Sequence, residues 1–137
     1  MSWMISVIED DDAIREELRD VLIARGLRVL EARNGAEVLA LVRRQGVRPA
    51  LLVLDLMMPV MDGWGLLNAQ SSEPLLDGVP VIIITAHEPA GPFPATVHAV
   101  LRKPFALSSL LVSVRELTAD MQSPKRPTLR LRPDDDT

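Results

Sequence analysis

The 137-residue chain contains no cysteine and no tyrosine, and aromatic residues make up only 3% of it. The lack of cysteine excludes disulfides, thiolate metal ligands and cysteine nucleophiles. No apolar run approaches the ~20 residues that a membrane-spanning helix needs. The net charge of -4 lacks the basic excess that nucleic acids and anionic membranes select. We therefore expect no direct nucleic-acid or membrane partner.

The first residues lack the features of a secretion signal. The segment 1–12, MSWMISVIEDDD, has no basic leader and no long apolar core, and it turns acidic by Glu9. We therefore expect a cytoplasmic protein. Hydrophobic residues make up 47% and charged residues 25% of the chain, which is the balance of a globular domain with a real core.

Short apolar runs alternate with segments of helical periodicity. The runs predict strands at residues 4–8, 27–32, 51–54, 81–85 and about 97–101, and the periodic segments predict helices around 14–22, 38–42, 64–67 and 107–119. Three of the runs are almost continuously apolar, which is typical of parallel strands buried on both faces. This alternation predicts an α/β fold, a three-layer doubly wound sandwich.

The segment between the fourth and fifth strands breaks this rhythm. Residues 86–96 read AHEPAGPFPAT, with Pro89, Pro92 and Pro94. Proline lacks an N–H and disfavours helix at the residue before it. We expect the fourth crossover helix to be missing or reduced to about one turn.

The chain divides into a predicted domain, residues 1–119, and a C-terminal tail, residues 120–137. The tail contains many prolines and charged residues. Such a composition cannot bury enough apolar surface to order a chain, so we expect the tail to be disordered.

Five polar residues follow or end strands of the predicted sheet, and four of the five strands contribute. They are Glu9, Asp10, Asp55, Thr85 and Lys103. Ligands of open parallel sheets bind outside the carboxyl ends of the strands, near the point where the strand order reverses. We therefore expect these side chains to meet in one crevice.

Three carboxylates in one crevice repel one another. At ~5 Å and an effective dielectric near 20, each ionised pair costs roughly 3 kcal/mol. A hard divalent cation with oxygen ligands, Mg²⁺ or else Mn²⁺, would offset this cost and polarise a phosphoryl group. Asp55 is then the candidate nucleophile, because carboxylates form aspartyl-phosphates. The Thr85 hydroxyl and the Lys103 ammonium would contact phosphoryl oxygens.

Four stretches resemble the response-regulator receiver family of two-component signalling, in the order that the family has them. They are VIEDDDAIREEL, LLVLDLMMPVMDG, VIIITA and LRKPF, and the resemblance covers about residues 3–118. It implies a five-stranded parallel sheet in the order 2-1-3-4-5. It also implies a cis Lys103–Pro104 bond, and a small Ala86 that leaves room for the phosphoryl group.

The resemblance assigns a role to each residue of the crevice. Asp55 becomes the phosphorylation site, and Thr85 and Lys103 take the phosphoryl contacts. The implied metal ligands are Glu9, Asp10 as a direct ligand, Asp55 and the backbone carbonyl of Met57.

The chain departs from the family pattern downstream of the phosphorylation site. The usual aromatic switch residue lies three positions before the lysine, and here that position is Val100. The proline-containing 86–96 segment alters the same side of the domain, which commonly serves dimerisation and output. We expect phosphate chemistry to be kept and the output surface to be changed.

A structural role is the simpler interpretation of several other residues. His87 is expected in an exposed loop and His98 in a structural position, and neither lies on the helical hairpin expected of a phosphodonor histidine. Asp62 with Gly63 predicts a turn. Helix capping is expected of Asp11 or Asp12, and coverage of the sheet edge or a helix is expected of Trp3 and Trp64.

The leading hypothesis is a stand-alone response regulator, phosphorylated on Asp55 by a histidine kinase or phosphotransfer protein. It would act on an unknown downstream protein, and would catalyse only its own phosphorylation and dephosphorylation rather than turn over external substrates. The alternative is a phosphorylation-independent interaction module, motivated by Val100 and the missing helix. A phosphatase is disfavoured, because Met57 stands where such enzymes carry a second aspartate.

Overall fold

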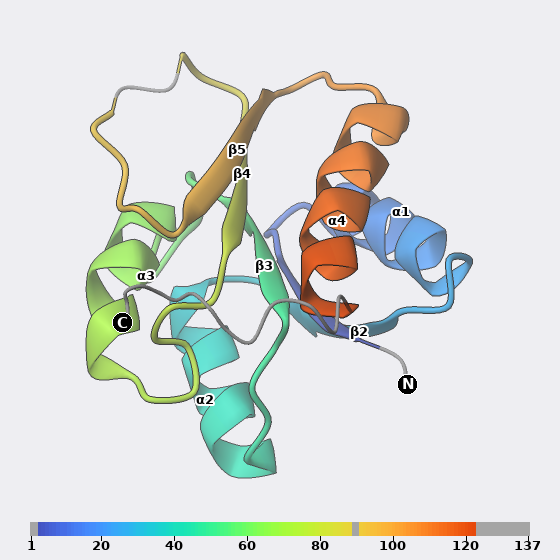
Figure 1. Ribbon diagram of the computed structural model, residues 1–137. Coiled ribbons are helices and arrows are strands. Elements are labelled where there is room, and N and C mark those ends of the chain that lie inside the picture. Colours follow the sequence, from blue (N-terminus) through green and yellow to red (C-terminus); the bar gives the residue numbers. More distant parts are fainter. Residues whose placement is uncertain (1–2, 89–90, 123–137) are drawn as a thin grey trace.

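Five parallel strands form one sheet in the computed structural model, which describes residues 3–88 and 91–122 (Figure 1). The strands are β1 (Met4–Ile8), β2 (Arg28–Ala32), β3 (Leu51–Asp55), β4 (Val81–Thr85) and β5 (Val97–Arg102). Their order is β2-β1-β3-β4-β5, and every neighbouring pair is parallel. The predicted doubly wound fold and strand order are confirmed.

Helices cover both faces of the sheet. They are α1 (Asp12–Ile23), α2 (Gly35–Gln45), α3 (Gly63–Ala69) with the short 3-10 helix η1 (Gln70–Ser72), and α4 (Leu107–Gln122). In Figure 1, α1 and α4 lie side by side on one face, and α2 and α3 lie on the other. Helix α4 continues three residues beyond its predicted end. The rest of the predicted tail, residues 123–137, lies outside the described residues.

Short polar side chains start three of the helices. Asp11 accepts a hydrogen bond from the backbone N–H of the residue three positions on, and so do Asn34 and Asp62. These bonds satisfy N–H groups that have no partner within the first turn of a helix. Asp11 is therefore the cap of α1, and Asp62 caps α3.

The sheet separates two apolar cores. Leu52 and Leu54 of β3 face the core under α2 and α3, whereas Leu51 and Val53 face the core under α1 and α4. All four are fully buried, and burial of each such side chain contributes about 1.5–3 kcal/mol. Because β3 is buried on both faces, its last residue, Asp55, is held in a fixed place at the carboxyl-terminal edge of the sheet.

The connection from β4 to β5 contains no helix in its described residues, 86–88 and 91–96. The prediction of a missing helix is confirmed there. Phe93 instead stacks on Trp64 of α3, with ring centroids 5.1 Å apart and ring planes 2° apart. Thr96 donates a hydrogen bond to the buried Gln70. The irregular segment is thus fastened to α3 and η1.

Trp3 packs against the core that α1 and α4 cover, in agreement with the role expected of it. Within residues 3–88 and 91–122, no helix is long and apolar enough to cross a membrane.

Candidate functional site

The carboxyl ends of β1 and β3 bring three acidic residues together. Carboxylate oxygens of Glu9, Asp10 and Asp55 all lie within 4.8 Å of one another. Glu9 and Asp55 are buried and Asp10 is exposed. The three carboxylates therefore meet in one place, as expected from the strand ends, with two buried at the base of the site and one on the solvent side.

Lys103 joins this cluster from the end of β5. Its Nζ donates to Glu9 Oε1 at 2.7 Å and lies 3.5 Å from Asp55 Oδ2. Burial alone would lower the pKa of Lys103, but hydrogen bonds and charge from Glu9 and Asp55 raise it overall. Lys103 therefore stays protonated and offsets part of the repulsion between the carboxylates.

Burial makes the charge of Glu9 costly. Burial raises its pKa from 4.5 to about 7, although hydrogen bonds from Lys103 and the Asp11 N–H act in the opposite direction. The neighbouring Asp55 raises the pKa further. A cation placed among these carboxylates would favour the ionised form of Glu9.

Asp55 is oriented by the loop that follows it. Its Oδ1 accepts a hydrogen bond from the Met57 N–H at 3.2 Å, and the Gly63 N–H donates to the Leu56 carbonyl at 3.0 Å. The other oxygen, Oδ2, lies on the side of Lys103. The Met57 side chain is half exposed, and the metal-binding role of its carbonyl stays a prediction.

Thr85 lies buried at the end of β4. Its Oγ1 accepts a hydrogen bond from the His87 N–H at 3.2 Å, which leaves the hydroxyl hydrogen available to donate. Ala86, next in the chain, is exposed. The Lys103–Pro104 bond is cis, as the resemblance implies.

The two histidines lie apart from any phosphodonor arrangement. The His87 side chain is exposed, and it is the backbone N–H of this residue that donates to Thr85 Oγ1. His98 Nε2 lies 3.3 Å from Glu116 Oε1, across β5 and α4. The expected loop and structural positions of these two residues agree with the structure.

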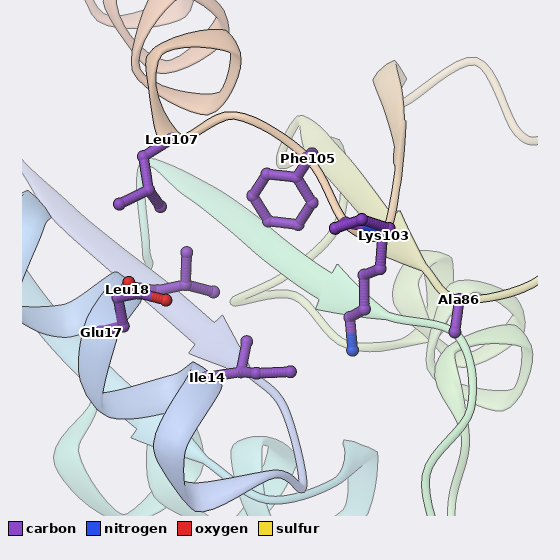
Figure 2. Close-up of a pocket in the computed structure, with 8 residues that line it drawn as sticks. Ile14, Glu17, Leu18, Ala86, Lys103, Phe105 and Leu107 are labelled. Atoms are coloured by element: carbon purple, nitrogen blue, oxygen red, sulfur yellow. The ribbon is translucent and has the colours of Figure 1, made fainter.

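A pocket of about 480 Å³ opens beside Lys103, between α1 and the connection from β5 to α4. Figure 2 shows Ile14 and Leu18 of α1 on one side, with Phe105 and Leu107 on the other. These walls are apolar, and the ammonium of Lys103 stands at the edge of the pocket. Glu17 of α1 also lines the pocket, so apolar surface with a charged margin lies beside the acidic cluster.

Sequence reasoning missed Arg15, a buried arginine of α1. It shares its helix face with Leu18 and Leu22, and its Nη1 donates to the Glu9 carbonyl at 3.0 Å. The signal that could have identified it is the helical spacing of this charged residue with two apolar leucines. Such a group needs a partner, and here the partner lies in the acidic site.

The donor set suits a hard divalent cation. Carboxylate oxygens from separate strands converge, and no cysteine is available anywhere in the chain. Mg²⁺ and Mn²⁺ prefer such oxygen ligands. Glu9, Asp10 and Asp55 can therefore hold such an ion, and the chemistry of the residues fits it.

The chain belongs to the response-regulator receiver family of two-component signalling, because the family model described as "Response regulator receiver domain" matches residues 5–115. The response regulator MprA of Mycobacterium ulcerans (strain Agy99) is 38% identical over 121 residues, which is 85% of this chain and 50% of that protein. The chain thus spans about half the length of the curated relatives it matches.

Solved receiver structures agree with this assignment. The receiver domain of the hybrid histidine kinase CckA matches with a TM-score of 0.70 and 32% identity. The alignment covers 83% of this chain and 97% of that domain. The non-phosphorylated HemR receiver domain of Leptospira biflexa has a TM-score of 0.72 at 25% identity, covering 93% and 100%. Receiver domains are signalling proteins that bind Mg²⁺ at an acidic pocket and interact with histidine kinases and effectors.

Proposed function

We propose that this chain accepts a phosphoryl group on Asp55 from a histidine kinase or phosphotransfer protein and signals through protein contact. The observation that carries the proposal is the cluster of Glu9, Asp10 and Asp55 within 4.8 Å, with Lys103 Nζ against two of them. We propose the cytoplasm as the compartment.

In the proposed reaction, a carboxylate oxygen of Asp55 attacks the phosphorus of a phosphohistidine. The new P–O bond forms as the P–N bond breaks, and the imidazole nitrogen keeps the electron pair and takes up a proton. Lys103 pairs with one phosphoryl oxygen, and the Thr85 hydroxyl donates to another. The residues that would hold Mg²⁺ or Mn²⁺ are Glu9, Asp10, Asp55 and the carbonyl of Met57. The bound ion supplies charge neutralisation of the phosphoryl oxygens.

Dephosphorylation is proposed to use the same groups. Water attacks the phosphorus of the aspartyl-phosphate, and a new P–O bond forms as the P–O bond to Asp55 breaks. The Asp55 carboxylate leaves with the electron pair, and a proton of the water is released to solvent with inorganic phosphate. Position 57, two residues after the nucleophile, is a methionine, which cannot act as an acid or base for an external substrate. The chain would therefore act on itself rather than as a turnover enzyme.

The apolar pocket beside Lys103 supports docking of the phosphodonor protein. Its walls come from α1 and the β5–α4 connection, so a helix of the partner that covers it would lie next to Lys103 (Figure 2). The Nζ of Lys103 lies 3.5 Å from Asp55 Oδ2. Burial of apolar surface contributes ~25 cal/mol per Å². The pocket thus supplies affinity, and the acidic cluster supplies the chemistry.

Intact-mass measurement after incubation with acetyl phosphate and Mg²⁺ tests the proposal. Wild type should gain the mass of one phosphoryl group, and Asp55→Asn and Asp55→Ala should gain none. Chelation of the metal should abolish the gain in wild type. If wild type gains no mass, and a cognate kinase also fails to phosphorylate it, the phosphorylation-independent interaction module is favoured instead.

We also propose that the segment 86–96 carries the output. Val100 supplies no aromatic ring to rotate, while the segment begins directly after Thr85 and is fastened by the Phe93–Trp64 stack. A charge-assisted hydrogen bond from Thr85 to the phosphoryl group would contribute about 1.5–3 kcal/mol. That is enough to shift the population of the ordered segment tenfold or more. Amide exchange across residues 86–102 should slow with beryllofluoride and Mg²⁺, and unchanged exchange would contradict this route.

A further inference from the structure

Arg15 is a buried cation one turn into α1, on the face that packs against the sheet. The residue is 7% exposed and lies in line with Leu18 and Leu22. An arginine is seldom buried to this extent unless its guanidinium is paired and hydrogen-bonded. Its partners therefore indicate what the position is for.

The three nitrogens of the guanidinium have separate partners. Nη1 donates to the Glu9 carbonyl at 3.0 Å, Nη2 to Asp12 Oδ1 at 2.6 Å, and Nε to Glu31 Oε1 at 3.3 Å. The two carboxylates balance the charge of the guanidinium. What remains specific is the bond from Nη1 to a backbone oxygen in the acidic site.

That oxygen belongs to the peptide group that joins Glu9 to Asp10. The N–H of Glu9 is already fixed by the Ala32 carbonyl at 3.0 Å, and its carboxylate by Lys103 and the Asp11 N–H. Because β1 ends at Ile8, the hydrogen bonds of the sheet do not orient this peptide plane. The bond from Arg15 supplies that orientation, and the plane in turn sets the direction in which Asp10 leaves the backbone.

We infer that Arg15 is a positioning residue of the metal site: it holds the Glu9–Asp10 peptide so that both carboxylates face Asp55. This inference rests on the proposed function, because it concerns the same metal site. Groups that orient metal ligands typically change metal affinity 10–100-fold when they are removed. Arg15 would act through the backbone and never touch the metal.

The chain offers a matched control on the same helix. Arg19 also bonds to Glu31, through Nη1 at 3.4 Å, and its Nε bonds to Asp20 at 3.0 Å. Neither of these bonds reaches Glu9 or Asp10. Arg19→Gln therefore removes the same charge and a bond to the same glutamate, but leaves the Glu9 carbonyl bonded.

The experiment is calorimetric titration of Mg²⁺ into the full chain, with no phosphodonor, for wild type, Arg15→Gln, Arg15→Lys and Arg19→Gln. We expect Arg15→Gln to weaken Mg²⁺ binding 10–100-fold and Arg19→Gln to leave it within twofold of wild type. Arg15→Lys keeps the charge and one donor nitrogen in place of three, so it should recover part of the affinity. The rate of phosphorylation by acetyl phosphate should then be restored by higher Mg²⁺ concentration.

A general loss of stability is separated by Leu22→Ala, which removes buried apolar contacts from the same helix without touching the site. All titrations are made well below the lowest midpoint of unfolding. If Arg15→Gln binds Mg²⁺ as tightly as Arg19→Gln, or no more weakly than Leu22→Ala, the inference is wrong. If wild type itself binds no Mg²⁺, the proposed function fails instead, so the two failures are distinguishable.

Discussion

Gly63 lies directly against the backbone of Asp55. A Cβ atom at Gly63 would come within 2.6 Å of the Asp55 carbonyl oxygen and within 2.7 Å of Leu56 Cα. Both neighbours are backbone atoms at the end of a strand that is buried on both faces, so neither has room to move aside. The start of α3 can therefore approach the site this closely only without a side chain.

Gly63→Ala should lower the free energy of unfolding by about 1–3 kcal/mol, the usual cost of overpacking. It should also slow phosphorylation, because relief of the clash displaces Asp55. Urea denaturation and intact mass after acetyl phosphate measure the two effects. Gly65→Ala is the control, since its Cβ would meet the flexible Met61 side chain at 3.1 Å. Equal behaviour of the two variants would contradict the prediction.

Glu9 should make the stability of the metal-free protein depend on pH. Its pKa is about 7 in the folded state against an ordinary value of 4.5, so between these values the folded state binds more protons than the unfolded state. The stabilisation is fully present below pH 4.5 and is lost as pH rises through 7. The full shift corresponds to roughly 3 kcal/mol.

Glu9→Gln isolates this contribution, because glutamine does not titrate. In the presence of a chelator, the free energy of unfolding of wild type minus that of Glu9→Gln should fall as pH rises from 4.5 to 7.5. Saturating Mg²⁺ should reduce the fall, because the ion favours the charged carboxylate. A difference that stays flat with pH in the chelated protein would show that Glu9 titrates at its ordinary pKa.

Val60 is a β-branched residue with a φ of 72° in the loop after β3, and it is 87% exposed. The left-handed region costs about 1–2 kcal/mol for an L-residue, and glycine avoids this cost while losing more chain entropy on folding. Val60→Gly should therefore raise the free energy of unfolding by about 0.5–1 kcal/mol in chemical denaturation. Val112→Gly, at an exposed position inside α4, should instead lower it, by roughly 0.3–0.5 kcal/mol from helix propensity.

The Phe93–Trp64 stack should anchor the β4–β5 connection. Phe93→Ala and Trp64→Leu should each destabilise the protein, and a double-mutant cycle should give a coupling of about 0.5–1.5 kcal/mol. Trp3→Phe in the background leaves Trp64 as the sole tryptophan, so its fluorescence should report the loss of Phe93. A coupling of zero would mean that the segment is held by other contacts, such as that of Thr96 with Gln70.

The strand order was predictable from the resemblance to the receiver family. The cluster of Glu9, Asp10 and Asp55 was predictable from the residues, because the carboxyl ends of the strands of one parallel sheet share an edge. The pairing of Lys103 with Glu9 was not, since the sequence assigned that lysine to phosphoryl oxygens and left open which carboxylate it meets when no phosphoryl group is bound. The bond joins residues 94 positions apart. Such a choice depends on side-chain distances that spacing along the chain does not contain.

Local patterns also located the missing helix but not what replaces it. Pro89, Pro92 and Pro94 disfavour a helix whatever surrounds them, because proline removes an N–H donor in any context. The partner of Phe93 depends instead on how α3 packs across the sheet. Trp64 was predicted only to cover the sheet edge or a helix, and the stack with Phe93 became visible once both elements were placed.

The helix-free connection between β4 and β5 also affects which receiver domains can pair with this chain. Receiver domains commonly pair through the side of the fold where that helix would stand. Across residues 86–88 and 91–96 this chain presents an irregular segment, anchored by the Phe93–Trp64 stack and the Thr96–Gln70 hydrogen bond. We expect a sibling receiver that needs a matching helix to find no complementary surface here. The segment would thus insulate this signalling circuit from mixed assemblies in a cell that contains several such proteins.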